Sequence, residues 1–234
     1  MNPVADNLEA VRVRIRTACA SAERAADSVT LLAVSKTFDA EAVRAAAAAG
    51  QGAFGENYVQ EGVAKIAALR DSGLDLQWHC IGPLQSNKTR DVAEHFDWVQ
   101  SVDRLKIAER LSAQRPEHLA PLQVCVQVNV DAAPTKSGVR PDEALALCQA
   151  IAQLPRLQLR GLMAVPDATD SVALHAAFTD AQALFDQIKS AGLPDASSFD
   201  TLSLGMSADL EAAVRAGSTM VRVGSAIFGA RHYG

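Results

Sequence analysis

Short apolar runs alternate with longer amphipathic stretches along nearly the whole chain. Apolar runs bounded by turn residues are typical of buried strands, and apolar residues that recur every three or four positions are typical of helices. We therefore expect eight strands, one within each of these runs: TLLAVSK (30–36), GAFGEN (52–57), LQWHCIG (76–82), FDWVQSVD (96–103), LQVCVQVNVD (122–131), LQLRGLMAV (157–165), FDTLSLGMS (199–207) and TMVRVGSAIFG (219–229).

Helical stretches follow these strands, and their ends carry recognisable signals. Asp39 precedes the alanine-rich stretch after the first run and Gly50 follows it, which predicts an N-cap and a stop. Ser86 or Asn87 is the expected N-cap of the helix after the third run. A further helix is predicted at the front of the chain, over residues 1–18.

Eight successive βα units favour the α/β class and a single (β/α)8 TIM barrel with an extra N-terminal helix. The expected loops around 131–140 and 164–171 are too short to hold a second domain, so residues 1–234 are expected to form one domain. The alternative is a doubly wound open sheet, because the pattern alone does not show that the sheet closes.

Composition limits the class of protein. Hydrophobic residues at 49% and charged residues at 21% are ordinary for a globular chain, and the net charge of −5 disfavours nucleic acid or an anionic membrane as the main partner. No apolar run reaches membrane-span length, and four widely spaced cysteines without a CxxC pair disfavour a metal site. We expect a cytoplasmic protein with reduced thiols.

The first apolar run ends at a lysine, Lys36, which is costly to remove from water. In a barrel the catalytic face lies at the carboxyl ends of the strands, so this position favours a functional amine. The alternative is a side chain that reaches out of the strand into water.

Two small turns follow the seventh and eighth runs, where barrels often bind phosphate. The first ends at Ser207 and the second contains Gly224 and Ser225, and such small residues let the backbone approach an anion. Ser207 could instead be only an N-cap, and Gly224 only a packing glycine.

Arg222 interrupts the apolar eighth run between two valines, so alternation places it on the opposite face of the strand. A buried arginine needs a partner, which is either a carboxylate in the barrel mouth or a ligand. A lysine, a phosphate-binding turn and an arginine together describe a pocket for a phosphorylated aldehyde.

Seven stretches then carry a family resemblance over almost the whole chain: LLAVSKT, FGENYVQE, WHCIGPLQSNK, KSGV, RGLMAVP, LSLGMSADLEAA and TMVRVGSAIFGAR. In this order they resemble the pyridoxal phosphate homeostasis proteins, which share the barrel of alanine racemase. The resemblance implies that pyridoxal 5′-phosphate (PLP) is bound as an internal aldimine with Lys36.

The resemblance also implies the remaining site residues. Expected cofactor-binding residues, with no catalytic or metal-binding ones, are Lys36, Asn57, His79, Met163, Ser207, Arg222, Gly224 and Ser225. Of these, Ser207, Gly224 and Ser225 are expected to hold the phosphate, and Arg222 to face the pyridine nitrogen. Cys80 stands where the family more usually has an aromatic residue, which leaves the contact there open.

An arginine against the pyridine nitrogen disfavours its protonation, so carbanion chemistry would be poorly supported. Racemisation also needs a second acid or base, and the two tyrosines, Tyr58 and Tyr233, are not obvious substitutes. We therefore expect a monomeric carrier in vitamin B6 homeostasis that supplies PLP to apo-enzymes, not an enzyme. The alternatives are a minimal amino-acid racemase and a class I aldolase whose lysine attacks a sugar-phosphate carbonyl.

Overall fold

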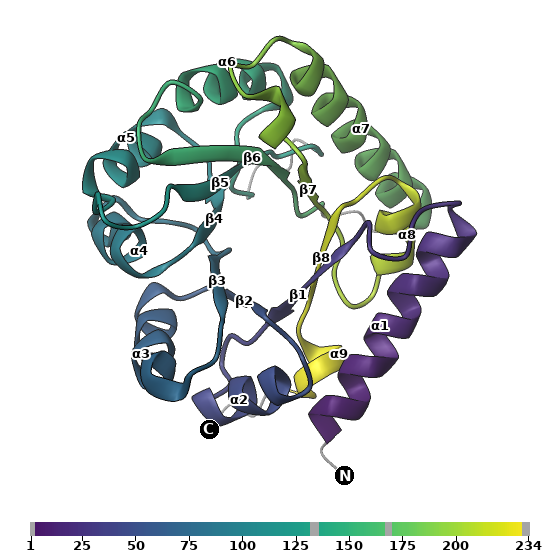
Figure 1. The fold of residues 1–234 in the computed structure, drawn as a ribbon. Coiled ribbons are helices and arrows are strands. Elements are labelled where there is room, and N and C mark those ends of the chain that lie inside the picture. Colours follow the sequence, from purple (N-terminus) through teal and green to yellow (C-terminus); the bar gives the residue numbers. More distant parts are fainter. Residues whose placement is uncertain (1–2, 132–135, 167–169, 231–234) are drawn as a thin grey trace.

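The strands form a closed barrel (Figure 1). The computed structural model describes residues 3–131, 136–166 and 170–230. All eight strands are parallel, and β1 pairs with both β2 and β8. They span Thr30–Val34 (β1), Ala53–Glu56 (β2), Gln77–Cys80 (β3), Trp98–Val102 (β4), Leu122–Gln127 (β5), Leu157–Met163 (β6), Thr201–Ser203 (β7) and Met220–Val223 (β8). The predicted barrel is confirmed, and the open-sheet alternative is wrong.

A ring of helices surrounds the strands (Figure 1). They span Pro3–Ser21 (α1), Ala40–Ala48 (α2), Val59–Leu69 (α3), Thr89–His95 (α4), Leu105–Gln114 (α5), Pro141–Ile151 (α6), Ser171–Ser190 (α7), Leu210–Arg215 (α8) and Ser225–Phe228 (α9). The extra N-terminal helix α1 packs against α8 and α9. None of the helices in the described ranges is long and apolar enough to cross a membrane.

The predicted helix ends are partly confirmed. The Asp39 side chain caps α2 by accepting a hydrogen bond from the backbone N–H of Ala42 (2.9 Å), and Gly50 follows the helix with φ +79°. The predicted cap at Ser86 or Asn87 is wrong, because both lie in a short 3₁₀ turn and α4 begins only at Thr89.

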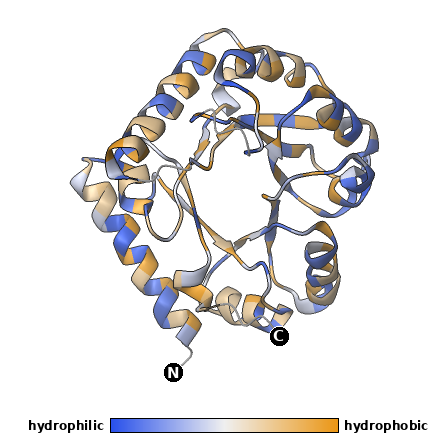
Figure 2. Cartoon of the chain, turned by 180° about the vertical axis from the view of Figure 1, so that it is seen from behind, coloured by the Kyte–Doolittle hydropathy of each residue, from blue (hydrophilic) through white to orange (hydrophobic). Residues whose placement is uncertain are grey.

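Most apolar side chains are buried between the strands and the helical ring. One large cluster contains residues of all eight strands, such as Phe54 of β2, together with helix residues such as Leu8 of α1 and Val43 of α2. The helices in Figure 2 carry both hydrophobic and hydrophilic segments, as expected for elements with one face on the core. The four cysteines are buried and form no disulfide. This packing fixes the strand ends, where the predicted site residues lie.

Candidate functional site

A cavity of about 380 Å³ opens at the carboxyl ends of the strands. This volume suits a small molecule, since ligand pockets usually enclose ~300–1,000 Å³. We call it the mouth cavity, and it is lined by Val34, Lys36, Asn57, Ile81, Val165, Met206, Ser207, Ala208, Arg222, Gly224 and Ser225. Six of the eight predicted cofactor-binding residues are therefore brought together at one place.

Lys36 lies in the turn that follows β1, and its side chain is half-buried at the cavity wall. Phe38, two residues further on, stacks on Phe228 of α9 with ring centroids 5.1 Å apart. The turn that carries the amine therefore packs directly against the helix that follows β8.

Two backbone turns, which follow β7 and β8, form a further part of the cavity wall. The first passes through Gly205, whose φ of +89° lies in the region that favours glycine, and leads to Ser207. No described residue accepts a hydrogen bond from the backbone N–H of Ser207 or Ala208. The second turn begins α9, where the backbone N–H groups of Ser225 and Ala226 have no acceptor among the described residues, while Ile227 donates to the carbonyl oxygen of Gly224 (2.9 Å). Both turns can donate backbone hydrogen bonds to an anion.

Helix α1 holds both turns from outside the barrel. The side-chain amide of Asn7 donates to the carbonyl oxygen of Ile227 in α9 (2.9 Å). Arg14 donates to the carbonyl oxygen of Ser207 (2.9 Å) and forms two hydrogen bonds with the carboxylate of Glu211 (2.7 and 2.9 Å). The extra helix thus stabilises the turns that line the cavity.

Arg222 is buried, yet its partners are not carboxylates. Its Nη1 donates to the carbonyl oxygen (2.7 Å) and the hydroxyl (2.6 Å) of Ser203, and its Nη2 donates to the carbonyl oxygen of Ala164 (2.9 Å). No described carboxylate lies within salt-bridge distance of this arginine. Burial lowers the pKa of Arg222 to about 10, so it remains a cation at pH 7. Its Nε–H and the second Nη2–H are left for a ligand.

His79 does not line the mouth cavity but lies inside the barrel. Its Nδ1 accepts a hydrogen bond from the side-chain amide of Gln100 (2.9 Å), and Gln100 in turn accepts one from the hydroxyl of Ser203 (2.7 Å). Burial lowers the pKa of His79 to about 3, so the ring is neutral at pH 7. This histidine is connected to Arg222 through two intervening side chains, and the expectation that it contacts a cofactor stays a prediction.

Met163 also lies away from the lining. It packs with Trp98 and Cys125 in a small apolar cluster separate from the main core. Cys80 at the end of β3 is buried as well, and burial raises the pKa of its thiol to about 12. Neither residue is at the wall of the mouth cavity.

Asn57 follows β2 and lines the mouth cavity, and the backbone of the loop after β3 passes close to it. A Cβ atom on Gly82 would stand 2.2 Å from the carbonyl oxygen of Asn57, a contact that only glycine avoids. Gly82 therefore allows the loop after β3 to pack on the loop after β2.

The remaining lining residues are not among the predicted cofactor-binding residues, although Met206 belongs to the predicted turn that ends at Ser207. They are Val34, Ile81, Val165, Met206 and Ala208. All of them neighbour a predicted strand end, so position in the barrel is the only signal that could have found them. Lys136 approaches the same wall, since its Nζ donates to the carbonyl oxygen of Val165 (2.7 Å).

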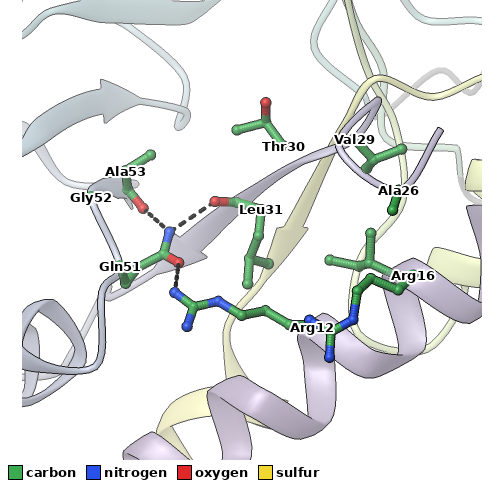
Figure 3. Close-up of a pocket in the computed structure, with 10 residues that line it drawn as sticks. Arg12, Arg16, Ala26, Val29, Thr30, Leu31, Gln51, Gly52 and Ala53 are labelled. Carbon is green, nitrogen blue, oxygen red and sulfur yellow. Dashed lines mark hydrogen bonds between the residues drawn. The ribbon is translucent and has the colours of Figure 1, made fainter.

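A second cavity, of about 360 Å³, lies at the opposite, amino ends of β1 and β2 (Figure 3). Its polar groups already bind one another: the amide of Gln51 donates to the carbonyl oxygens of Leu31 and Ala53 (2.8 Å each). Arg12 donates to the carbonyl oxygens at the end of α2 (2.8 and 2.9 Å). These contacts attach α1 to the barrel, so the mouth cavity is the better candidate for a ligand site.

Comparison with known proteins first defines the class. Residues 7–232 match the family described as "Alanine racemase, N-terminal domain". The alanine racemase of Corynebacterium glutamicum has the same fold, with a TM-score of 0.72 at 19% identity over 97% of this chain and 61% of that one. The protein is thus a barrel of the alanine racemase type with a lysine after its first strand.

Closer relatives narrow this class. Proteins named "Pyridoxal phosphate homeostasis protein" are 55% identical in Pseudomonas aeruginosa (100% of this chain, 98% of the relative) and 53% identical in Escherichia coli (100% and 99%). The chain belongs to the family of pyridoxal phosphate homeostasis proteins, as the sequence motifs predict. PipY of Synechococcus elongatus, solved with PLP bound, has a TM-score of 0.81 at 38% identity over 97% of this chain and 100% of that one.

Proposed function

We propose that this chain binds PLP in the mouth cavity, bonded covalently to Lys36, and carries or buffers it for vitamin B6 homeostasis. The observation that supports this most strongly is the position of one lysine amine, one arginine and two small serine-containing turns around a single cavity. The homeostasis relatives and the PLP-bound PipY structure support the same choice of ligand.

The donor groups of the cavity fit such a molecule. The backbone N–H groups and hydroxyls at Ser207 and Ser225 would hold the phosphate, with Gly224 leaving room for it. The two remaining N–H groups of Arg222 would face the pyridine nitrogen, and Val34 and Ile81 would cover the ring. When bound, PLP supplies an aldehyde that condenses reversibly with a primary amine.

The lining favours a carrier over an enzyme. Its described residues offer one amine and no carboxylate, imidazole, phenol or thiol that could serve as a second acid or base. Tyr58, which the sequence did not favour as such a group, is 62% exposed at the start of α3 and does not line the cavity. Tyr233 lies outside the described residues. We propose a one-domain cytoplasmic monomer whose recipients are the apo forms of PLP-dependent enzymes.

The decisive experiment is the intact mass of the protein incubated with PLP, before and after borohydride reduction, with the modified peptide mapped. One stable adduct on Lys36 is expected, and its absence would refute the proposal. Exchange of the Cα proton of L-amino acids by the PLP-loaded protein would favour the racemase alternative instead. A colourless protein that reacts with sugar phosphates would favour the aldolase alternative.

Arg222→Gln is expected to weaken PLP retention about 10- to 100-fold, because hydrogen bonds to a charged group contribute about 1.5–3 kcal/mol. The absorbance spectrum of the bound state should also shift, because the group facing the pyridine nitrogen is changed. Equilibrium dialysis and absorbance spectra provide the measurement. Arg160→Gln is the matched control, since this arginine pairs with Asp200 and lies outside the mouth cavity. Unchanged affinity and spectrum in Arg222→Gln would contradict the assigned contact.

Ser207→Ala is expected to have a smaller effect on PLP affinity, at most about 1–3 kcal/mol for one charge-assisted contact. The effect is limited because the backbone N–H groups of the turn remain. The same dialysis measurement checks it. A complete loss of binding with an intact fold would mean that the hydroxyl, and not the backbone, holds the phosphate.

A further inference from the structure

A buried cluster of charged side chains lies beneath the turn that carries Lys36. Lys65 of α3 is 5% exposed, and its Nζ donates to the Oε1 atoms of Glu56 (2.8 Å) and Glu61 (2.7 Å). The same amine donates to the carbonyl oxygen of Ser35 (2.7 Å), and the hydroxyl of Ser35 donates to Glu56 (2.6 Å). Ser35, the residue before Lys36, is therefore held by two hydrogen bonds, one through its carbonyl oxygen and one through its hydroxyl. We refer to these three side chains as the Glu56–Lys65–Glu61 cluster.

The residue after Lys36 is held by the same cluster. The backbone N–H of Thr37 donates to Oε1 of Glu61 (2.5 Å). Thr37 has a φ of +69°, a left-handed conformation that is rare for a β-branched residue. The cluster therefore fixes the backbone on both sides of Lys36, including a strained position that the local sequence does not favour.

Stability alone does not account for such a cluster. Glu56 is completely buried, and its Oε2 has no hydrogen-bond partner among the described residues. Burial raises the pKa of Glu56, while the charge of Lys65 opposes that rise. Buried ion pairs contribute little net stability compared with well-packed apolar side chains, so a role in holding the turn explains the charges better.

We propose that the Glu56–Lys65–Glu61 cluster positions the Lys36 amine for bond formation with an aldehyde in the mouth cavity. This inference rests on the proposed function. In the step concerned, the nitrogen of the neutral amine forms a double bond to the aldehyde carbon, the carbon–oxygen bond breaks, and the oxygen leaves as water with the two amine protons, without an oxidant or reductant. None of the three side chains lines the cavity, so they act through the turn and not on the ligand. A fixed turn holds the amine near its attack geometry and so speeds this step.

Glu61→Ala tests the proposal, because it removes the acceptor of the Thr37 N–H from a side chain that is 27% exposed. We expect covalent adduct formation with PLP, followed by stopped-flow absorbance, to slow about tenfold or more. Affinity for pyridoxine 5′-phosphate, an alcohol that cannot form the bond, should stay unchanged, because the cavity lining is intact. Glu61→Gln should keep most of the rate, since an amide oxygen can accept the same hydrogen bonds.

Glu41→Ala is the matched control, because it removes an equally charged, 77% exposed side chain that contacts Arg44 on α2. It should leave both measurements unchanged. A wild-type rate in Glu61→Ala would overturn the inference and leave the proposed function standing. If Glu61→Ala also loses affinity for pyridoxine 5′-phosphate, the inference is overturned as well, because Glu61 would then support the whole cavity and not the position of the amine. If the wild-type protein forms no adduct at Lys36, the proposed function itself fails, and the inference fails with it.

Discussion

The Lys36→Ala variant is expected to lose the borohydride-stable PLP adduct and its absorbance completely, because no other described lysine lines the mouth cavity. The barrel should remain folded. Lys36 lies in a turn and is half-buried, so its truncation leaves no large void in the apolar core. Intact mass spectrometry after reduction, together with circular dichroism, measures both outcomes.

Lys106→Ala is the control for this experiment, since Lys106 is an exposed lysine on α5, outside the cavity lining. This variant should form the adduct like the wild-type protein. A stable adduct that persists at another single lysine in Lys36→Ala would refute the assignment of Lys36. If the variant loses both the adduct and the circular dichroism signal, Lys36 is needed for folding, which would contradict the expectation from its position in the turn.

The Lys65→Met variant is expected to lose about 3–5 kcal/mol of unfolding free energy, because removing one partner leaves a buried charge uncompensated. The uncompensated charge would be that of Glu56, because this side chain is completely buried and Lys65 is its only cationic partner among the described residues. Urea unfolding at pH 7, followed by circular dichroism, measures the difference.

A second substitution distinguishes two causes of the stability loss in Lys65→Met, the uncompensated charge and the altered packing. In the double variant Glu56→Gln/Lys65→Met both charges are removed, so a substantial part of the lost stability should return. A single variant Lys65→Met that loses less than about 1 kcal/mol would contradict the view that the buried pair is tightly coupled. A double variant no more stable than the single one would attribute the loss to packing of the lysine stem.

The site was predictable where a residue type was unexpected in its local pattern. Lys36 at the end of an apolar run and Arg222 within an apolar strand both stood out, and both line the mouth cavity. His79 and Met163 followed only from family resemblance, and the structure places them in the barrel interior and in a separate apolar cluster. Alternation along a strand indicates which face a side chain occupies, but it does not indicate how far along the barrel axis that side chain reaches.

The hydrogen-bond partners of the buried charged residues could not be fully predicted from the sequence either. Arg222 was expected to need a carboxylate or a ligand, whereas the structure shows the carbonyl oxygen and hydroxyl of Ser203 in β7 and the carbonyl oxygen of Ala164, which follows β6. Lys65 has the sequence of an ordinary helix lysine that pairs with Glu61 four residues earlier, and only the fold adds the buried carboxylate of Glu56 from β2. The Arg222 contacts join residues from different strands, and the contact of Lys65 with Glu56 joins a helix to a strand, so neither is encoded by the pattern within one element.

The sequence by itself determined the number and order of the strands, the capping of α2, and the family, because these depend on local hydrophobic period, turn chemistry and motif order. Only the tertiary structure decided that the sheet closes, which strand ends share one cavity, and which side chains hold the Lys36 turn. Closure depends on the pairing of β1 with β8, whose residues are nearly two hundred positions apart, and that pairing brings Lys36 and Arg222 to the same cavity.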